Sequence, residues 1–167
     1  PTKGKQAWNN GKVTKYCNEC PGKGWVRGIK PLSEEPNCLN KPQGGLWGCH
    51  GTEWYDWCQA EGFRCYPKYI EWELDKSAQV LVLNDLADLD WVQDKYGADE
   101  KITDTWKIID WIKVSKDYDA VEVTEYAAYD LHLASSHSNP LGYNAWDVPS
   151  ICVWNMDKVK VIKEVFV

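Results

Sequence analysis

The sequence predicts an α+β fold in one domain, with two small, mostly antiparallel sheets and flanking helices. Short strands and helices are mixed along the chain without the regular strand–helix–strand spacing of a parallel sheet. The clearest strand, residues 69–74, alternates apolar and charged side chains, as a half-buried strand does. A chain of 167 residues is long enough for one substantial core, and it contains no repeat, linker or low-complexity tract.

The predicted strands are short runs of β-branched, aromatic or other apolar residues between polar or glycine-rich stretches. They cover residues 12–17, 46–49, 69–74, 80–83, 121–123, 151–154 and 159–167. Residues 18–45 are rich in glycine, proline and asparagine and are predicted to be a loop with at most a helical turn. Residues 126–145 are predicted to form a second long loop, and residues 157–159 a turn.

Three helices are predicted between these strands. Thr52 caps the first helix, and the second begins at Asn84 or Asp85. The third covers residues 106–114. The positions that give the three segments their helical spacing are Trp54, Trp57, Cys58 and Glu61; Leu86, Leu89 and Trp91; and Ile108, Ile109 and Ile112.

The composition is that of a soluble globular protein, with 44% hydrophobic residues, 26% charged residues and a net charge of −6. This acidic balance argues against broad binding to nucleic acid or to anionic membranes. No apolar run approaches the ~20 residues of a membrane span, and no basic-then-apolar signal sequence opens the chain. Seven cysteines without regular disulfide spacing fit a reducing compartment, so the sequence predicts a cytoplasmic protein.

The cysteines offer one candidate metal site. Cys17 and Cys20 have the CxxC spacing of a zinc knuckle or a redox motif, and Cys38, Cys49 and His50 could complete a ligand set. A structural zinc site usually has a second spaced pair, which the adjacent Cys49 and His50 do not supply. The sequence therefore predicts thiols and no metal site.

The stretch from Lys41 to Cys49 is the strongest candidate for ligand binding. Gly44 and Gly45 let a backbone approach a flat ligand closely, because no Cβ intervenes. Trp47 then places an indole face beside that opening. Backbone donors next to an aromatic surface suit a planar heteroaromatic ring that carries an amide, such as nicotinamide. The alternative is that the glycines form a turn and Trp47 packs in the core.

Two common nucleotide sites are not predicted. The chain has no GxGxxG after a strand, as a Rossmann dinucleotide site requires, and no GxxxxGK[ST] phosphate loop.

Four short motifs follow one another over most of the chain. They are Lys15-Tyr16-Cys17-Asn18, Gly45-Leu46-Trp47-Gly48-Cys49, the strand pair at 69–83, and residues 118–123 with 151–159. In this order they resemble the ADP-ribosyltransferase superfamily, most closely its small bacterial and phage members and more distantly the poly(ADP-ribose) polymerase catalytic domains. The family's first motif has His or Arg where Cys17 stands here, and Arg27 could take that place in another register.

The resemblance implies a split β-sandwich that uses NAD as its substrate. It implies cleavage of the nicotinamide–ribose bond and transfer of ADP-ribose to a protein or nucleic-acid acceptor, as in a phage or bacterial effector or toxin. The residues that would hold the nicotinamide half are Tyr16, Cys17, Asn18, Gly45, Leu46, Trp47 and Trp54. Among them, Trp47 would stack on the ring, and Tyr16 and Cys17 would frame its carboxamide through backbone groups.

The resemblance also implies a catalytic carboxylate near the last strands, with two candidates. Asp147 precedes the strand at 151–154, and Glu125 follows the strand at 121–123. Such a carboxylate would bind a ribose hydroxyl and stabilise the positive charge that develops on the sugar. Asp147 is preferred, because a Trp-Asp pair beside the closing strand suits a fixed, partly buried carboxylate.

Two other classes of function fit the same residues. A non-catalytic protein that blocks a host complex would use the acidic surface and exposed tryptophans as an interface. A carbohydrate-binding module would line several of the eleven tryptophans along a groove.

Overall fold

The computed structural model describes residues 5–7, 12–16, 30–34, 41–49, 53–62, 68–101, 107–124 and 148–166. The strands are β1 (Lys5–Ala7), β2 (Lys12–Tyr16), β3 (Leu46–Gly48), β4 (Lys68–Leu74), β5 (Gln79–Leu83), β6 (Gly97–Lys101), β7 (Lys107–Ile109), β8 (Ala120–Val123), β9 (Ser150–Val153) and β10 (Val159–Phe166). The helices are α1 (Glu53–Ala60), α2 (Leu86–Tyr96), α3 (Trp111–Asp117) and the 3₁₀ helix η3 (Met156–Lys158).

These strands form one five-stranded sheet in the order β1-β5-β8-β9-β3, one three-stranded sheet in the order β10-β4-β2, and the pair β6-β7. The predicted α+β class is confirmed. Pairing among the described strands is antiparallel except between β5 and β8, which are parallel. The prediction of two sheets omitted the β6-β7 pair. The parallel pair is possible because residues 84–119, with α2 and α3, form a connection long enough to return the chain to the same end of the sheet.

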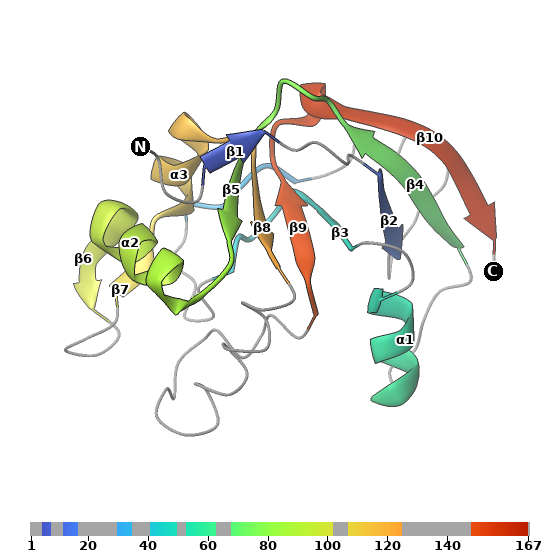
Figure 1. The fold of residues 1–167 in the computed structure, drawn as a ribbon, viewed down its shortest axis with the longest axis horizontal. Helices are drawn as coiled ribbons and strands as arrows, with labels where there is room; N and C mark the ends of the chain where they lie inside the picture. The colour runs from blue at the N-terminus through green and yellow to red at the C-terminus, as the bar shows by residue number, and fades with distance from the viewer. Residues whose placement is uncertain are drawn as a thin grey trace.

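The five-stranded sheet is the middle of three layers, as Figure 1 shows. Helices α2 and α3 and the β6-β7 pair lie on one side of it, and the three-stranded sheet lies on the other. Successive side chains of a strand point to opposite faces, so each strand contributes to two separate cores. Leu81, Val121 and Cys152 face the helices, whereas Val80, Ala120 and Val153 pack with Trp72 of β4.

Helix α2 starts where the sequence predicts, with Asp85 as its N-cap and Leu86 as its first residue. The carboxylate of Asp85 accepts a hydrogen bond from the backbone N of Asp88 at 2.9 Å. The Asp88 carboxylate in turn accepts one from the backbone N of Asn84 at 2.9 Å. These two bonds satisfy amide groups that a helix leaves unpaired at its start.

The predicted helix over residues 106–114 is wrong in its first half. Residues 107–109 form β7, which pairs with β6, and α3 begins only at Trp111. Asp110 separates the two elements, because its carboxylate accepts a hydrogen bond from the backbone N of Lys113 at 3.0 Å and so caps α3. The β-branched Ile108 and Ile109 suit a strand as well as a helix, which is why their spacing misled the prediction.

The short strands β1 and β6 were not predicted from the sequence, because each depends on a partner elsewhere in the chain. The pairing of β1 joins Lys5 to Leu81 of β5, and that of β6 joins Gly97 to Ile109 of β7. The predicted loop at 126–145 lies outside the described residues, as does Thr52. No helix in the described ranges is long and apolar enough to cross a membrane.

Candidate functional site

Four strands bring distant parts of the chain to one edge of the sheets. Gly48 of β3 pairs with Ile151 of β9, and Val123 of β8 pairs with Ser150 of β9. The ends of β3 and β8 and the start of β9 therefore lie together, and we call this place the strand-end edge. Strand β2, which ends at Tyr16, contacts β3 and runs toward the same side in Figure 1.

Several predicted site residues lie within three positions of these strand ends in the sequence. Glu125 follows Thr124, the last described residue after β8, and Asp147 precedes Val148, the first described residue before β9. Both candidate acids lie outside the described residues, as do Cys17 and Asn18. The backbone of Tyr16 pairs with Tyr69 at the end of β2. Trp54 belongs to α1, which contacts β2, and its side chain is outside the described part.

Gly44 and Gly45 form a tight turn with φ angles of +95° and +72°. A Cβ on Gly44 would lie 2.1 Å from the carbonyl oxygen of Pro31, and one on Gly45 would lie 2.8 Å from Sγ of Cys152. The backbone N–H of Gly45 donates to the carbonyl of Lys30 at 2.9 Å. The expectation that this amide is available to a ligand is therefore wrong. The close approach that the glycines allow is made by the protein's own chain.

Leu46 and Trp47 point to opposite faces of the five-stranded sheet. Leu46 has 0% of its surface exposed and lies in the core between the two sheets, so its side chain packs and does not line a ligand site. Trp47 is half-buried on the helix side, where it packs against the cluster that contains its cross-strand partner Cys152. Nζ of Lys41 lies 4.9 Å from the centre of the indole ring, at cation–π distance. A ring stacked on that side of Trp47 would have to displace the ammonium group.

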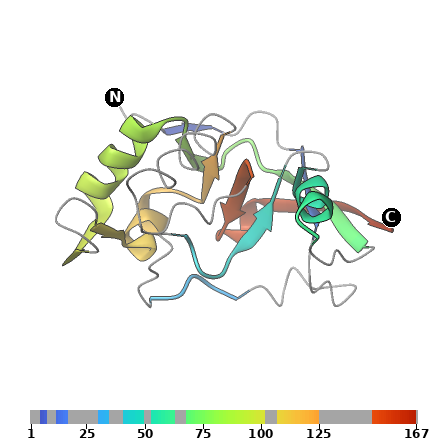
Figure 2. The same ribbon diagram turned by 90° about the horizontal axis from the view of Figure 1, so that it is seen from below.

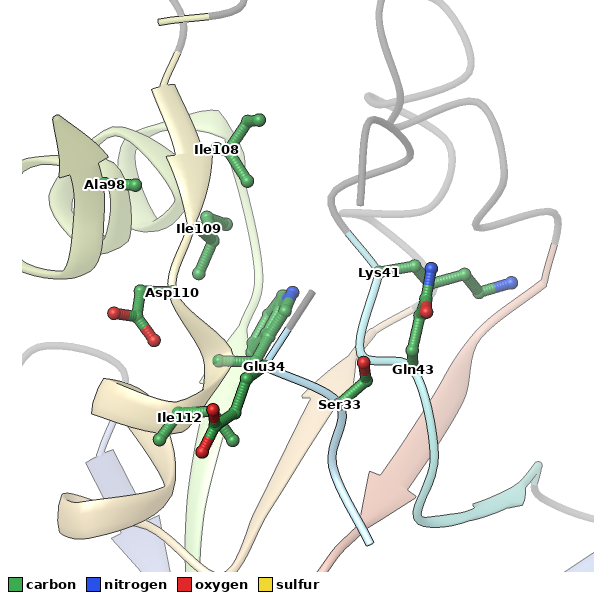
Figure 3. Close-up of a pocket in the computed structure, with 10 residues that line it drawn as sticks. Ser33, Glu34, Lys41, Gln43, Ala98, Ile108, Ile109, Asp110 and Ile112 are labelled. Carbon is green, nitrogen blue, oxygen red and sulfur yellow. The ribbon is translucent and has the colours of Figure 1, made fainter. Parts of the chain in front are cut away.

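A separate cleft of about 300 Å³ lies near the start of β3. One wall is the β7–α3 junction, and the other is formed by residues 33–34 and 41–43, as Figure 3 shows. The segment leading into β3 passes beside α3 in Figure 2. The lining residues are Ser33, Glu34, Lys41, Gln43, Ala98, Ile108, Ile109, Asp110, Trp111 and Ile112.

Sequence reasoning missed this cleft, because its walls come from a segment taken as connecting loop and a segment taken as one helix. The spacing of Ile108, Ile109 and Ile112 predicted a helix over residues 106–114 and gave no sign of a cleft.

A polar cluster joins α2 to the end of α3. The hydroxyl of Tyr96 donates to the Asp117 carboxylate at 2.5 Å, and Nζ of Lys95 lies 3.3 Å from the same oxygen. Burial, followed by the hydrogen bond to Asp117, raises the pKa of Tyr96. Burial, followed by the charge of Tyr96, raises the pKa of Tyr118 to about 12. Both phenols therefore stay protonated at neutral pH, and the cluster connects helices without supplying a base.

The described residues contain no group of three or more His, Cys, Asp and Glu side chains that could hold a metal ion. Cys49 is buried directly after β3. The other members of the candidate zinc set, Cys17, Cys20, Cys38 and His50, lie outside the described residues, so the prediction of no metal site stays a prediction.

No protein-family model, curated protein or solved structure matches this chain.

Proposed function

We propose that this protein is an NAD-dependent ADP-ribosyltransferase that acts at the strand-end edge. The observation that supports the proposal is the meeting of β2, β3, β8 and β9, which are far apart in the sequence. These are the strands that carry or flank the motifs of the resemblance. A single site that binds nicotinamide and stabilises charge on the adjoining ribose needs residues from all of them.

The reaction breaks the bond between C1′ of the ribose and the ring nitrogen of nicotinamide, and the bonding electrons go to that nitrogen. Nicotinamide leaves as a neutral molecule because the ring is cationic in NAD, so no strong acid is needed. A nucleophile of the acceptor then bonds to C1′ and loses its proton. What accelerates this step is a carboxylate near the developing positive charge and a rigid hold on the nicotinamide.

Either candidate acid suits this role from its place in the chain. Val123 and Ser150 are paired residues, and Glu125 and Asp147 are each within three positions of one of them. Glu125 therefore follows the end of β8 and Asp147 precedes the start of its antiparallel partner β9, so both acids are close in sequence to the same end of this strand pair. We assign Asp147 as the charge-stabilising residue and retain Glu125 as the alternative.

The nicotinamide would lie past the end of β3, with Trp47 on the helix side of the five-stranded sheet and the end of β2 on the other side. Because the Gly45 amide is engaged by Lys30, hydrogen bonds to the carboxamide would come from the backbone after Tyr16, at Cys17 and Asn18. The partners of the reaction are NAD and a protein or nucleic-acid acceptor.

The test is to incubate the full chain with NAD, with and without a cell lysate, and to measure released nicotinamide by chromatography. We expect release above the rate without protein, and loss of that release in the double variant Asp147→Asn, Glu125→Gln. Asp157→Asn, at an exposed aspartate on η3, is the control and should retain it. Absence of release under every condition, with the chain folded, would contradict the proposal and leave a partner-binding protein.

A further inference from the structure

The cleft has one wall of residues 33–34 and 41–43 and a second wall at the β7–α3 junction, and backbone hydrogen bonds fix both walls. The backbone N of Ser33 donates to the carbonyl of Gln43 at 2.9 Å, which joins the two loop segments of the first wall. The backbone N of Asp110 donates to the carbonyl of Tyr96 at 2.9 Å, which holds the second wall to α2. The cleft is therefore formed before any ligand binds, as small-molecule sites usually are.

The two walls differ in chemistry. Ile108, Ile109 and Ile112 give the second wall an apolar surface, and Figure 3 shows them across the cleft from Ser33 and Gln43. Gln43 is exposed, and its carboxamide makes no hydrogen bond within the described part of the chain. A guest in this cleft therefore meets an apolar face on one side and a hydroxyl and an amide on the other.

The indole of Trp111 backs the apolar wall. Trp111 is 6% exposed, and its Nε1 has no hydrogen-bond partner among the described residues. A buried donor without a partner is uncommon in folded proteins. Because this nitrogen is itself buried, it offers no hydrogen bond to a ligand in the cleft, and Trp111 contributes apolar surface to the wall.

The charges around the cleft favour an uncharged guest. The carboxylate of Asp110 caps α3 and lies 3.7 Å from Nζ of Lys113, and the ammonium of Lys41 lies over Trp47. The lining residues include no arginine, and Glu34 and Asp110 would repel a phosphate. A free phosphate or a nucleotide phosphate therefore does not belong inside this cleft.

We propose that the cleft binds a purine base, adenine in preference to guanine. A volume of about 300 Å³ is at the small end of ligand pockets, enough for one ring system with its sugar but not for a dinucleotide. The isoleucines would pack on the ring face. The Gln43 carboxamide offers the donor and acceptor that match the amino group and N7 of adenine, whereas guanine presents two acceptors on that edge.

This site is separate from the strand-end edge. The cleft lies before the start of β3, the strand-end edge lies at the end of β3, and none of the residues that line the cleft belongs to the strands that meet at the edge. Purine binding at the cleft does not require NAD cleavage at the edge.

The test is a titration of adenosine into the full chain with labelled isoleucine methyl groups, followed by NMR. We expect saturable shifts at Ile108 and Ile112, with weaker binding of guanosine and cytidine. Gln43→Glu keeps the size but removes the amide donor, and it should weaken adenosine binding about 3- to 10-fold. Gln59→Glu, at an exposed glutamine on α1, is the matched control and should leave the affinity unchanged.

Three results would overturn the proposal: no saturable shift with adenosine, equal affinity for guanosine or cytidine, or equal affinity of the Gln43→Glu and Gln59→Glu variants. Addition of NAD to the adenosine complex then identifies the source of the base. Displacement of adenosine indicates the adenine half of NAD, and its retention indicates a free nucleoside or a nucleic-acid base. Both outcomes support a purine site, and neither depends on nicotinamide release.

Discussion

The two ends of β3 differ in the parts of the chain that lie beside them. At its start, Gly44 and Gly45 are covered by Pro31 and Cys152, and Leu46 is sealed in the core. At its end, Gly48 adjoins the strands that flank the predicted catalytic acids. A pair of glycines beside a tryptophan indicates that something comes close to the backbone. The pattern does not determine whether that is a ligand or the protein's own chain, because both need the same absence of a Cβ.

The largest expected effect tests the end of β3 as a catalytic site. Asp147→Asn keeps the size of the side chain and removes its charge, so nicotinamide release should fall by ~10²–10³. The affinity for NAD should change much less, because the charge matters mainly in the transition state. Rates from chromatography and binding from tryptophan fluorescence separate the two effects.

Glu125→Gln is the matched variant for this prediction. A loss confined to Glu125→Gln would move the catalytic role to Glu125. Full activity in both variants would show that neither acid carries the charge.

The second prediction tests the start of β3 as a structural turn. Gly44→Ala should lower the free energy of unfolding by about 2–3 kcal/mol, because the new Cβ is both strained at φ +95° and only 2.1 Å from a backbone oxygen. Gly62→Ala, at φ +72° with nothing within 4 Å, should cost about 1–2 kcal/mol from strain alone. Urea denaturation of both variants measures the difference, and equal losses would contradict the close approach of Pro31.

Trp47 lies between the two ends of β3. Its substitution tests whether the indole contributes to NAD binding or only to packing in the core. Trp47→Ala should weaken NAD binding by ~1–3 kcal/mol, the range for loss of an aromatic stacking partner. Trp91→Ala removes a half-buried indole from α2 and serves as the control for loss of packing. Calorimetric titration with NAD should separate the variants. Unfolding of Trp47→Ala, or equal NAD affinity in both, would assign Trp47 to the core.

The smallest effect concerns the helix layer beside the cleft, which takes no part in the proposed chemistry. The folded-state pKa of Tyr118 is raised from 10.0 to about 12, so the native state keeps a proton that the unfolded chain loses. This contribution to stability is complete below pH ~10 and is lost as the pH rises toward 12. Urea midpoints at pH 9 and pH 11 should therefore differ less in Tyr118→Phe than in the wild type. An unchanged difference would contradict the raised pKa.

Most regular elements could be predicted because their signals are local. The alternation in residues 69–74 predicted β4, and the apolar run at 80–83 predicted β5. Asn84 and Asp85 marked the start of α2, and Asp85 is its N-cap. Each of these features is set by residues a few positions apart, where periodicity and capping act directly on the backbone.

The candidate site could be predicted only in part. The resemblance named residues beside β2, β3, β8 and β9, and the register joins β3, β8 and β9 at one edge while β2 contacts β3. The role of the Gly45 amide and of the Leu46 side chain could not be predicted, because it depends on Lys30 and on the opposite sheet.

By itself, the sequence determined the α+β class, the positions of most strands and the start of α2, since these follow from contacts within a few residues. Only the tertiary structure decided the parallel pairing of β5 with β8, the split of residues 107–117 into a strand and a helix, and the cleft beside Gln43. Each of these depends on which distant segment comes to pack against a given one. A local pattern determines which face of a strand or helix is apolar. Which distant segment packs against that face depends on the fold of the whole chain.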